Sequence, residues 1–207
     1  MNQFTYQFEN TSSQLETYEW DNVWWEHADT TGVPRVLYIG DSISCATRIV
    51  ANAAAQERIF FDGFGTSKSL DNPYFEASVR LFAAQQGERS AILFNNGLHG
   101  WHLDDATQYK TYYAQMVDFL LKTYPQTPLI LLLTTHVADS ERDKRVQVRN
   151  KAVLDIAQSR GLPVVDLYTI THDNAHLLSP DGVHLLTEGY QMLAEKILDA
   201  VNPFVFQ

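Results

Sequence analysis

Five short runs of mostly apolar residues are separated by longer stretches in which apolar and polar positions mix. The runs lie at 36–39, 59–61, 91–94, 129–133 and 164–167. Continuous apolar runs of this length are typical of strands buried on both faces, because both sets of alternating side chains then avoid water. The pattern therefore predicts five buried strands.

The stretches between these runs predict helices. The first is rich in alanine and holds neither proline nor glycine, and Gly161 after the fourth is a typical helix stop. Asp104 is the expected cap of the third helix. A turn is expected at residues 63–65 and a loop at 168–184. The predicted helices span 42–55, 74–86, 104–124, 143–160 and 185–201.

The alternation of strands and helices indicates an α/β fold, in which helices cover both faces of a parallel sheet. Five strands suggest a three-layer α/β/α, flavodoxin-like fold with a five-stranded parallel sheet in the order 2-1-3-4-5. The 207 residues fit one such domain. We assign it to residues 34–207 and expect residues 1–33, an aromatic-rich extension, to pack on it.

The charge balance restricts the partners. The chain has 15 basic and 25 acidic residues, a net charge of −10. An acidic surface repels phosphate groups, so neither nucleic acid nor an anionic membrane is an expected partner. The single cysteine, Cys45, excludes an internal disulfide. No signal-peptide pattern and no apolar stretch of about 18 residues is visible, so a cytoplasmic location is expected.

Ser42 is the first candidate for chemistry. Ligands of open α/β sheets bind at the carboxyl ends of the strands, and the first predicted strand leads into Gly40, Asp41 and Ser42. At the start of a helix, free backbone N–H groups and the helix dipole stabilise a developing alkoxide. More often, a serine there only caps the helix, so the position alone leaves both interpretations open.

Asp181 and His184 lie in a loop just before the last predicted helix. An aspartate three residues before a histidine can turn back onto the imidazole and stabilise its protonated form. A solvated aspartate beside a partly buried histidine is the alternative. The spacing by itself is weak evidence for a catalytic pair.

Two further strand ends carry candidates. Gly65 follows the second strand and either lets a backbone N–H approach a ligand or only makes a turn. The third strand leads into the polar segment 95–102. His99 and His102 have the spacing of a metal-binding pair, but no acidic or cysteine partner is nearby. We therefore expect neither a metal ion nor a cofactor.

Taken together and in this order, these segments resemble the SGNH (GDSL-like) hydrolase family. The G-D-S motif ending in Ser42 resembles the first family block, Gly65 the glycine of the second, and Asp181 with His184 the D-x-x-H of the last. The resemblance extends over residues 35–200, nearly the whole predicted domain. It implies a flavodoxin-like fold and hydrolysis of esters, commonly of acyl groups on carbohydrates, lipids or other small molecules.

The resemblance also implies the roles of these residues. Ser42 attacks the carbonyl and forms an acyl-enzyme, and His184 removes the serine proton and later protonates the leaving alcohol. Asp181 orients His184. The N–H groups of Ser42 and Gly65 form part of the oxyanion hole.

One block departs from the family pattern. The family usually has G-x-N-D, whose Asn donates to the oxyanion, whereas this chain has His99 and Gly100 at those two positions. Either His99 donates through a ring N–H, or the amide of Asn95 reaches the oxyanion. We expect Asn95, because its amide is an uncharged donor at any pH, and His99 is then free to contact substrate.

The expected substrate is a small-molecule ester with a short acyl group, acetyl on a carbohydrate being favoured. Asp41 and Trp101 are expected to contact it. Trp24 and Trp25 can offer a stacking platform to a sugar, although burial in the core is the expected role of this pair.

Other functions stay open. A lysophospholipase or thioesterase would show activity that rises with acyl length, and a non-catalytic carbohydrate-binding domain would bind sugar without turnover. A flavodoxin-type redox domain would carry a coloured cofactor. The sequence has no G-x-S-x-G elbow and no dinucleotide or P-loop motif, which argues against an α/β-hydrolase fold and against nucleotide binding.

Overall fold

A computed structural model of the protein describes residues 15–206. Within this range the strands form a six-stranded sheet in the order β1-β3-β2-β4-β5-β6. Strand β1 pairs antiparallel with β3, and the other neighbouring pairs are parallel. The strands are β1 (Asp21–Trp24), β2 (Arg35–Gly40), β3 (Phe60–Thr66), β4 (Ala91–Phe94), β5 (Leu129–Leu132) and β6 (Val164–Val165).

The parallel part of this sheet has the expected order 2-1-3-4-5, counted from β2 as its first strand. The expected count of five was wrong, because β1 adds an antiparallel edge strand from the N-terminal extension. All four β1 residues are exposed, so this strand lacks the buried pattern by which the others are found. Residues 1–14 of the extension lie outside the described residues.

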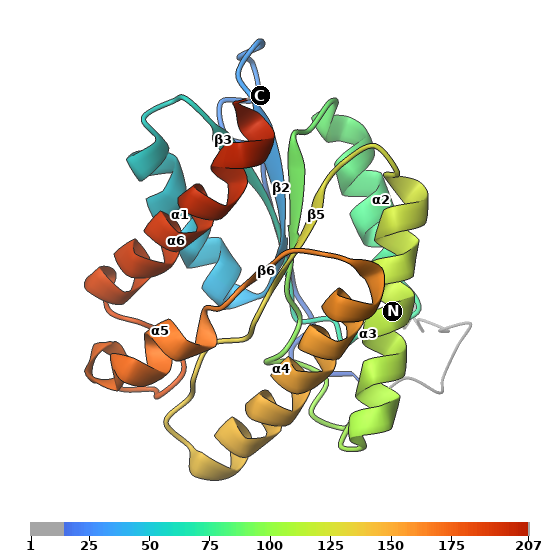
Figure 1. Ribbon diagram of the computed structural model, residues 1–207, viewed down its shortest axis with the longest axis vertical. Helices are drawn as coiled ribbons and strands as arrows, with labels where there is room; N and C mark the ends of the chain where they lie inside the picture. Colours follow the sequence, from blue (N-terminus) through green and yellow to red (C-terminus); the bar gives the residue numbers. More distant parts are fainter. Residues whose placement is uncertain (1–14, 207) are drawn as a thin grey trace, which may run out of the picture.

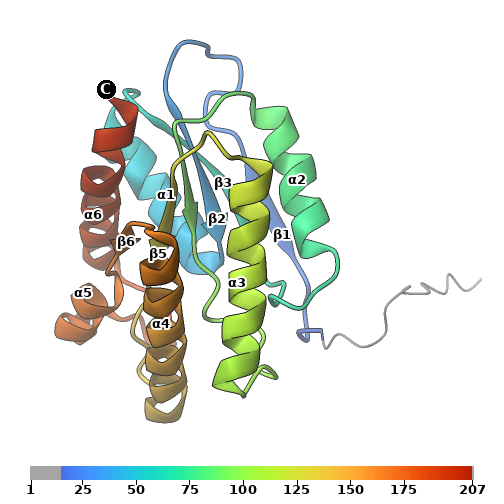
Figure 2. The same ribbon diagram turned by 45° about the vertical axis from the view of Figure 1, so that its right-hand side comes forward.

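Helices cover the sheet on both faces, which gives three layers (Figure 1, Figure 2). Helices α1, α5 and α6 lie on one face, and α2, α3 and α4 lie on the other. The helices are α1 (Ser42–Ala55), α2 (Phe75–Gln86), α3 (Ala106–Thr123), α4 (Ser140–Arg160), α5 (Tyr168–Asp173) and α6 (Thr187–Val205), and a 3₁₀ turn, η1, spans Ala175–Leu177.

Each face of the sheet has its own hydrophobic core. In β2, Leu37 and Ile39 pack into the core under α2, α3 and α4. Val36 and Tyr38 alternate with them and pack into the core under α1 and α6. Successive side chains of a strand point to opposite faces, so a strand between two helix layers buries side chains on both faces, and in β2 the buried residues 36–39 are all apolar. This confirms the reading of the apolar runs.

Strand β3 corrects the turn expected at residues 63–65. It continues as buried strand through Gly63 and Gly65 to Thr66. The two glycines weaken the local signal for a strand, but β3 is held by backbone pairing on both sides, with β2 and with β1. Pairing with β1 therefore keeps β3 in strand conformation beyond the point at which the local sequence predicts its end.

Other boundaries also differ from expectation, among them the ends of α6 and β6. Helix α3 is capped by Asp105 rather than Asp104, since the Asp105 carboxylate accepts from the N–H groups of two residues in the first turn. Helix α4 begins at Ser140, after its cap Asp139. The expected loop 168–184 contains α5 and η1. Among the described residues, no helix combines the length and hydropathy that a membrane span needs.

Candidate active site

Ser42 is presented by the junction between β2 and α1. Asp41 is the N-cap of α1, and its carboxylate accepts from Ile43 N–H at 2.9 Å. Because Asp41 caps the helix, the Ser42 hydroxyl is not needed for capping. Gly40 is required by the close turn, since a Cβ there would lie 2.7 Å from the Cβ of Ser44. Of the two interpretations of Ser42, simple capping is therefore wrong.

A closed loop before α6 holds Asp181 and His184. Ser179 N–H donates to the His184 carbonyl at 2.7 Å, and Gly182 N–H donates to the Ser179 carbonyl at 2.9 Å. Gly182 has φ of 72°, a left-handed conformation that glycine adopts without strain. Its carbonyl accepts from Ala138 N–H at 2.8 Å, which anchors the loop to the segment after β5.

A chain of hydrogen bonds links the three residues. His184 Nε2 lies 2.8 Å from Ser42 Oγ, and His184 Nδ1 lies 2.7 Å from Asp181 Oδ2. When Nδ1 carries the proton and donates it to the carboxylate, Nε2 is free to accept the serine hydroxyl proton. The side chains of His184 and Asp181 are 42% and 53% exposed, so the assembly opens to solvent.

The Asp181 carboxylate is fixed by several donors besides His184. Its Oδ1 accepts from the backbone N–H groups of Val183 and His184, each at 2.9 Å, and from the Ser179 hydroxyl at 2.7 Å. The Val183 N–H, the His184 ring and the Ser179 hydroxyl, in that order, hold the pKa of Asp181 well below its usual range. Asp181 therefore stays ionised over the range in which proteins work, and it can stabilise a positive imidazolium.

Gly65 lies beside the start of α1. It is in register with Gly40 of β2. A Cβ at Gly65 would lie 2.2 Å from Cys45 Sγ, 3.3 Å from the Asp41 carbonyl oxygen and 3.6 Å from the ring of Trp20. Glycine is therefore needed for close packing at this point, and Trp20 emerges as an aromatic neighbour of the site. No sequence pattern singled out Trp20, because it comes from an extension without periodicity.

The two alternative donors of the third block have different surroundings. Asn95 is buried, and its amide nitrogen donates to the Leu132 carbonyl at 2.8 Å and to Thr134 Oγ1 at 3.0 Å. Both amide hydrogens are thus directed towards β5. The His99 ring instead packs edge-on against Trp20, with 6.0 Å between ring centroids, and its Nδ1 lies 3.6 Å from Glu16 Oε1.

Arg149 of α4 organises the loop that carries His99. It is 3% exposed and donates to the carbonyl groups of Gly97, His99 and Gly100 at 2.7–3.0 Å. Burial lowers the pKa of this guanidinium, and the loop carbonyls replace the water that it has lost. Sequence reasoning missed Arg149, because a basic residue within a polar helix gives no signal of its distant partners.

The two residues expected to contact substrate have other partners. Asp41 is 2% exposed and caps α1, and its expected contact with substrate stays a prediction. The ring of Trp101 lies under guanidinium groups of α4, with Arg145 and Arg149 both 4.7 Å from its centroid. A sugar would have to compete with these cations for the ring.

His99 and His102 do not converge. His102 Nε2 lies 2.9 Å from Asp71 Oδ2, whereas His99 faces Glu16 and Trp20. Within residues 15–206, no three histidine, cysteine or acidic side chains are placed to hold a metal ion.

Comparison with known proteins identifies the family. Residues 38–192 match the GDSL-like lipase/acylhydrolase family. The chain belongs to this family. It is therefore a carboxylic ester hydrolase with a small-molecule ester as its substrate. No curated protein matches the chain.

Solved structures share the fold at low sequence identity. An acetyl xylan esterase is 17% identical with a TM-score of 0.65, over 81% of this chain and 99% of that one. A GDSL-like lipase from Bacteroides thetaiotaomicron is 17% identical with a TM-score of 0.66, over 82% and 88% of the two chains. A lipase/acylhydrolase from Enterococcus faecalis is 15% identical with a TM-score of 0.65, over 82% and 95%.

Proposed function

We propose that this hydrolase is a serine esterase that removes small acyl groups, acetyl above all, from carbohydrates. The observation that carries the proposal is the chain of hydrogen bonds from Ser42 through His184 to Asp181. A non-catalytic sugar-binding domain would have no use for a serine hydroxyl aligned on a histidine and a buttressed carboxylate. The acetyl xylan esterase among the structural neighbours supports the choice of acyl group and carrier.

The reaction follows from these contacts. Ser42 Oγ attacks the acyl carbonyl as its proton passes to His184 Nε2, and Asp181 stabilises the resulting imidazolium. The tetrahedral intermediate expels the sugar alcohol, which takes the proton from His184. Water then attacks the acyl-enzyme while His184 accepts a proton, and the carboxylic acid leaves as Ser42 is restored.

For the oxyanion we propose the N–H groups of Ser42 and Gly65, with His99 as the third donor. His99 is preferred over Asn95 because both amide hydrogens of Asn95 already have acceptors, one in β5 and one on Thr134 just after it. The contact of Glu16 with Nδ1 leaves Nε2 of His99 as the ring nitrogen available to a ligand.

The function is tested with p-nitrophenyl acetate, butyrate and octanoate, followed by acetylated xylo-oligosaccharides. We expect acetate to be cleaved best and Ser42→Ala to reduce turnover to background with an unchanged circular dichroism spectrum. Ser44→Ala, two residues along the same helix, serves as a matched control and keeps activity within several-fold. A rate that rises with acyl length would favour a lysophospholipase or thioesterase instead.

The oxyanion donors are separated by paired variants. His99→Ala should lower kcat by about 10²–10³-fold, the usual result of removing one oxyanion donor, and His99→Asn should restore part of it. Asn95→Ala should mainly lower the melting temperature, because it leaves the Leu132 carbonyl without its donor. The reverse pattern would transfer the donor role to Asn95.

A further inference from the structure

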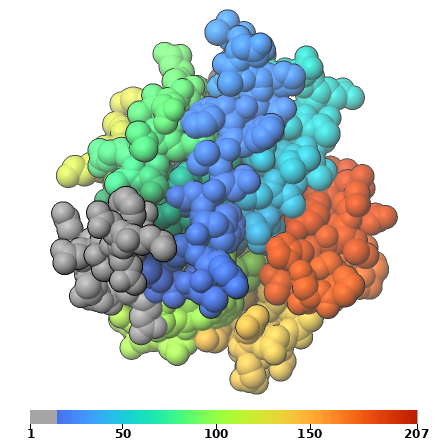
Figure 3. Space-filling view, turned by 180° about the vertical axis from the view of Figure 1, so that it is seen from behind, coloured from blue at the N-terminus to red at the C-terminus, as the bar shows by residue number. Residues whose placement is uncertain are grey.

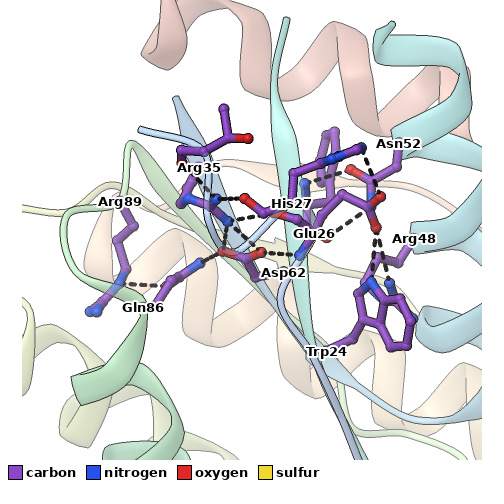
Figure 4. A network of polar contacts seen from close by, with 11 residues as sticks. Trp24, Glu26, His27, Arg35, Arg48, Asn52, Asp62, Gln86 and Arg89 are labelled. Atoms are coloured by element: carbon purple, nitrogen blue, oxygen red, sulfur yellow. Dashed lines mark hydrogen bonds and ion pairs between the residues drawn. The ribbon is translucent and has the colours of Figure 1, made fainter. Parts of the chain in front are cut away.

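A cavity lies at the edge of the sheet, away from Ser42. It measures about 580 Å³, within the range of small-molecule sites, and lies between the residues after β1 and the second half of α1. Its lining includes Trp24, Glu26, Arg48 and Asn52. Figure 3 shows the blue N-terminal segment running beside the cyan residues on this side of the molecule, and Figure 4 shows the polar contacts of the lining.

The cavity is connected to the proposed active site by two elements but is distinct from it. Arg48 and Asn52 follow Ser42 by six and ten residues on α1, so they lie about 9 and 15 Å further along the helix axis. On the other side, β1 runs antiparallel to β3 from Asp21, opposite Thr66, to Trp24, opposite Gly63. Both elements thus lead from the end of the sheet that holds Ser42 to the cavity.

Arg48 is a buried donor in the lining that lacks a hydrogen-bond acceptor. It is 5% exposed, and its Nε has no partner among the described residues. Its closest carboxylate oxygen belongs to Glu26, 3.9 Å from Nη1, which is an ion pair and too long for a hydrogen bond. Gly63 makes room for the Arg48 side chain, since a Cβ at this position would lie 2.6 Å from the Arg48 Nε.

Trp24 offers an aromatic surface that is already held in place. The Arg48 guanidinium lies over the ring, 5.4 Å from its centroid, and yet the residue is 51% exposed. Its indole N–H donates to Glu26 Oε2 at 2.9 Å, and the same oxygen accepts from Asn52 Nδ2 at 3.1 Å. A fixed ring with donors and acceptors around its edge matches a ligand with an apolar face and hydroxyl groups at its rim.

The charges around the ring favour a neutral ligand. Arg48 is offset by Glu26 at its side, and Glu57 adds a second acidic group to the lining. A strongly anionic ligand would be repelled by Glu26 and Glu57, and a strongly cationic ligand would be repelled by Arg48. We propose that the cavity is a saccharide-binding subsite, in which a neutral pyranose stacks on Trp24 and accepts a hydrogen bond from the Arg48 guanidinium while an ester-bearing residue further along the same oligosaccharide reaches Ser42. The link to Ser42 rests on the proposed function, whereas binding itself does not.

Binding is measured by calorimetry with unacetylated xylotetraose, which no esterase can turn over. We expect the parent to bind it, Trp24→Ala to weaken binding at least tenfold and Arg48→Met to weaken it several-fold. Tyr74→Ala, which removes an exposed aromatic ring outside the cavity, should bind as the parent does. Trp24→Phe keeps an aromatic face and should retain part of the affinity, which guards against a misfolded alanine variant.

Kinetics separate this proposal from the proposed function. Trp24→Ala should raise KM for acetylated xylo-oligosaccharides far more than it lowers kcat or the hydrolysis of p-nitrophenyl acetate. Turnover of esters without xylotetraose binding would overturn the subsite alone. Sugar binding that depends on Trp24 in a parent without ester turnover would uphold the subsite and remove the proposed function. Stronger binding of trigalacturonic acid than of xylotetraose would overturn the assignment of a neutral ligand.

Discussion

Two of the histidine–aspartate pairs among the described residues have the same Nδ1–carboxylate distance but different surroundings. His184 Nδ1 lies 2.7 Å from Asp181, and His136 Nδ1 lies 2.7 Å from Asp143. Both pairs follow the carboxyl ends of strands, where open α/β sheets place their ligands. A search for histidine–aspartate contacts alone would therefore treat them as equivalent.

The partners of each pair set them apart. Asp143 is 6% exposed and also accepts from the Tyr168 hydroxyl at 2.7 Å and from the Gln147 amide at 2.8 Å. The His136 ring packs edge-on against Tyr168 and His172. Asp181 lies at the surface, and its histidine faces a serine hydroxyl. In the proposed mechanism, His184 therefore differs from His136 because its second ring nitrogen contacts the Ser42 hydroxyl.

The largest contrast is expected between the two histidines. His184→Ala should reduce kcat/KM for p-nitrophenyl acetate by on the order of 10⁴-fold or more, because it removes the only base hydrogen bonded to Ser42 among the described residues. His136→Ala should keep activity within about tenfold and lower the melting temperature. Comparable losses in the two variants would contradict the assignment of a structural role to His136.

The aspartates should repeat this contrast at a smaller scale. Asp181→Asn keeps the shape but favours the wrong tautomer of His184, and a loss on the order of 10³–10⁴-fold in kcat is expected. Asp143→Asn should change kcat only a few-fold. The measurement is a kcat comparison on the acetyl ester, and a near-normal Asp181→Asn would show that Ser42 and His184 act without their third member.

The free energy of unfolding should rank the two aspartate variants in the opposite order to kcat. Asp143→Asn should lower the free energy of unfolding at pH 7 by about 1–3 kcal/mol, because buried donors lose their acceptor. Asp181→Asn changes an exposed group and should lower it less. Urea unfolding followed by circular dichroism makes the comparison.

The Asp143 contribution should also depend on pH. Burial alone would raise the pKa of Asp143, but hydrogen bonds from Tyr168, Gln147, Val137 N–H and His136 outweigh it and hold the pKa below its ordinary value. An aspartate with a depressed pKa stabilises the fold above its unfolded pKa of about 3.9 and loses that contribution as the pH falls through the folded value. The difference between the parent and Asp143→Asn should shrink below about pH 4. A difference of constant size down to pH 2 would argue against this linkage.

The smallest effect is expected at Ser179. Its hydroxyl is one of four donors to Asp181. Ser179→Ala should lower kcat by a few-fold, because the backbone N–H groups still hold the carboxylate. Loss of more than about 100-fold would show that the hydroxyl controls the orientation of the pair.

Much of the fold follows from local pattern. Helix α1 and strand β4 have the expected bounds, and the strand order of the parallel sheet is as expected. In each of these elements the buried residues are regularly spaced, and this spacing is visible in the sequence. The edge strand β1, by contrast, is exposed throughout and forms through backbone pairing with β3. Backbone pairing does not depend on the pattern of apolar and polar side chains, so that pattern does not predict β1.

The candidate site divides in the same way. The sequence by itself determined the contacts made over three residues, such as Asp181 with His184, since a short loop with glycine and proline brings them together. Only the tertiary structure decided the contact of His184 with Ser42, 142 residues away, and the enclosure of Arg48 beneath Trp24. Local hydrogen bonds depend on spacing along the chain, whereas these distant ones depend on how α1, β1 and the loop before α6 pack around one sheet.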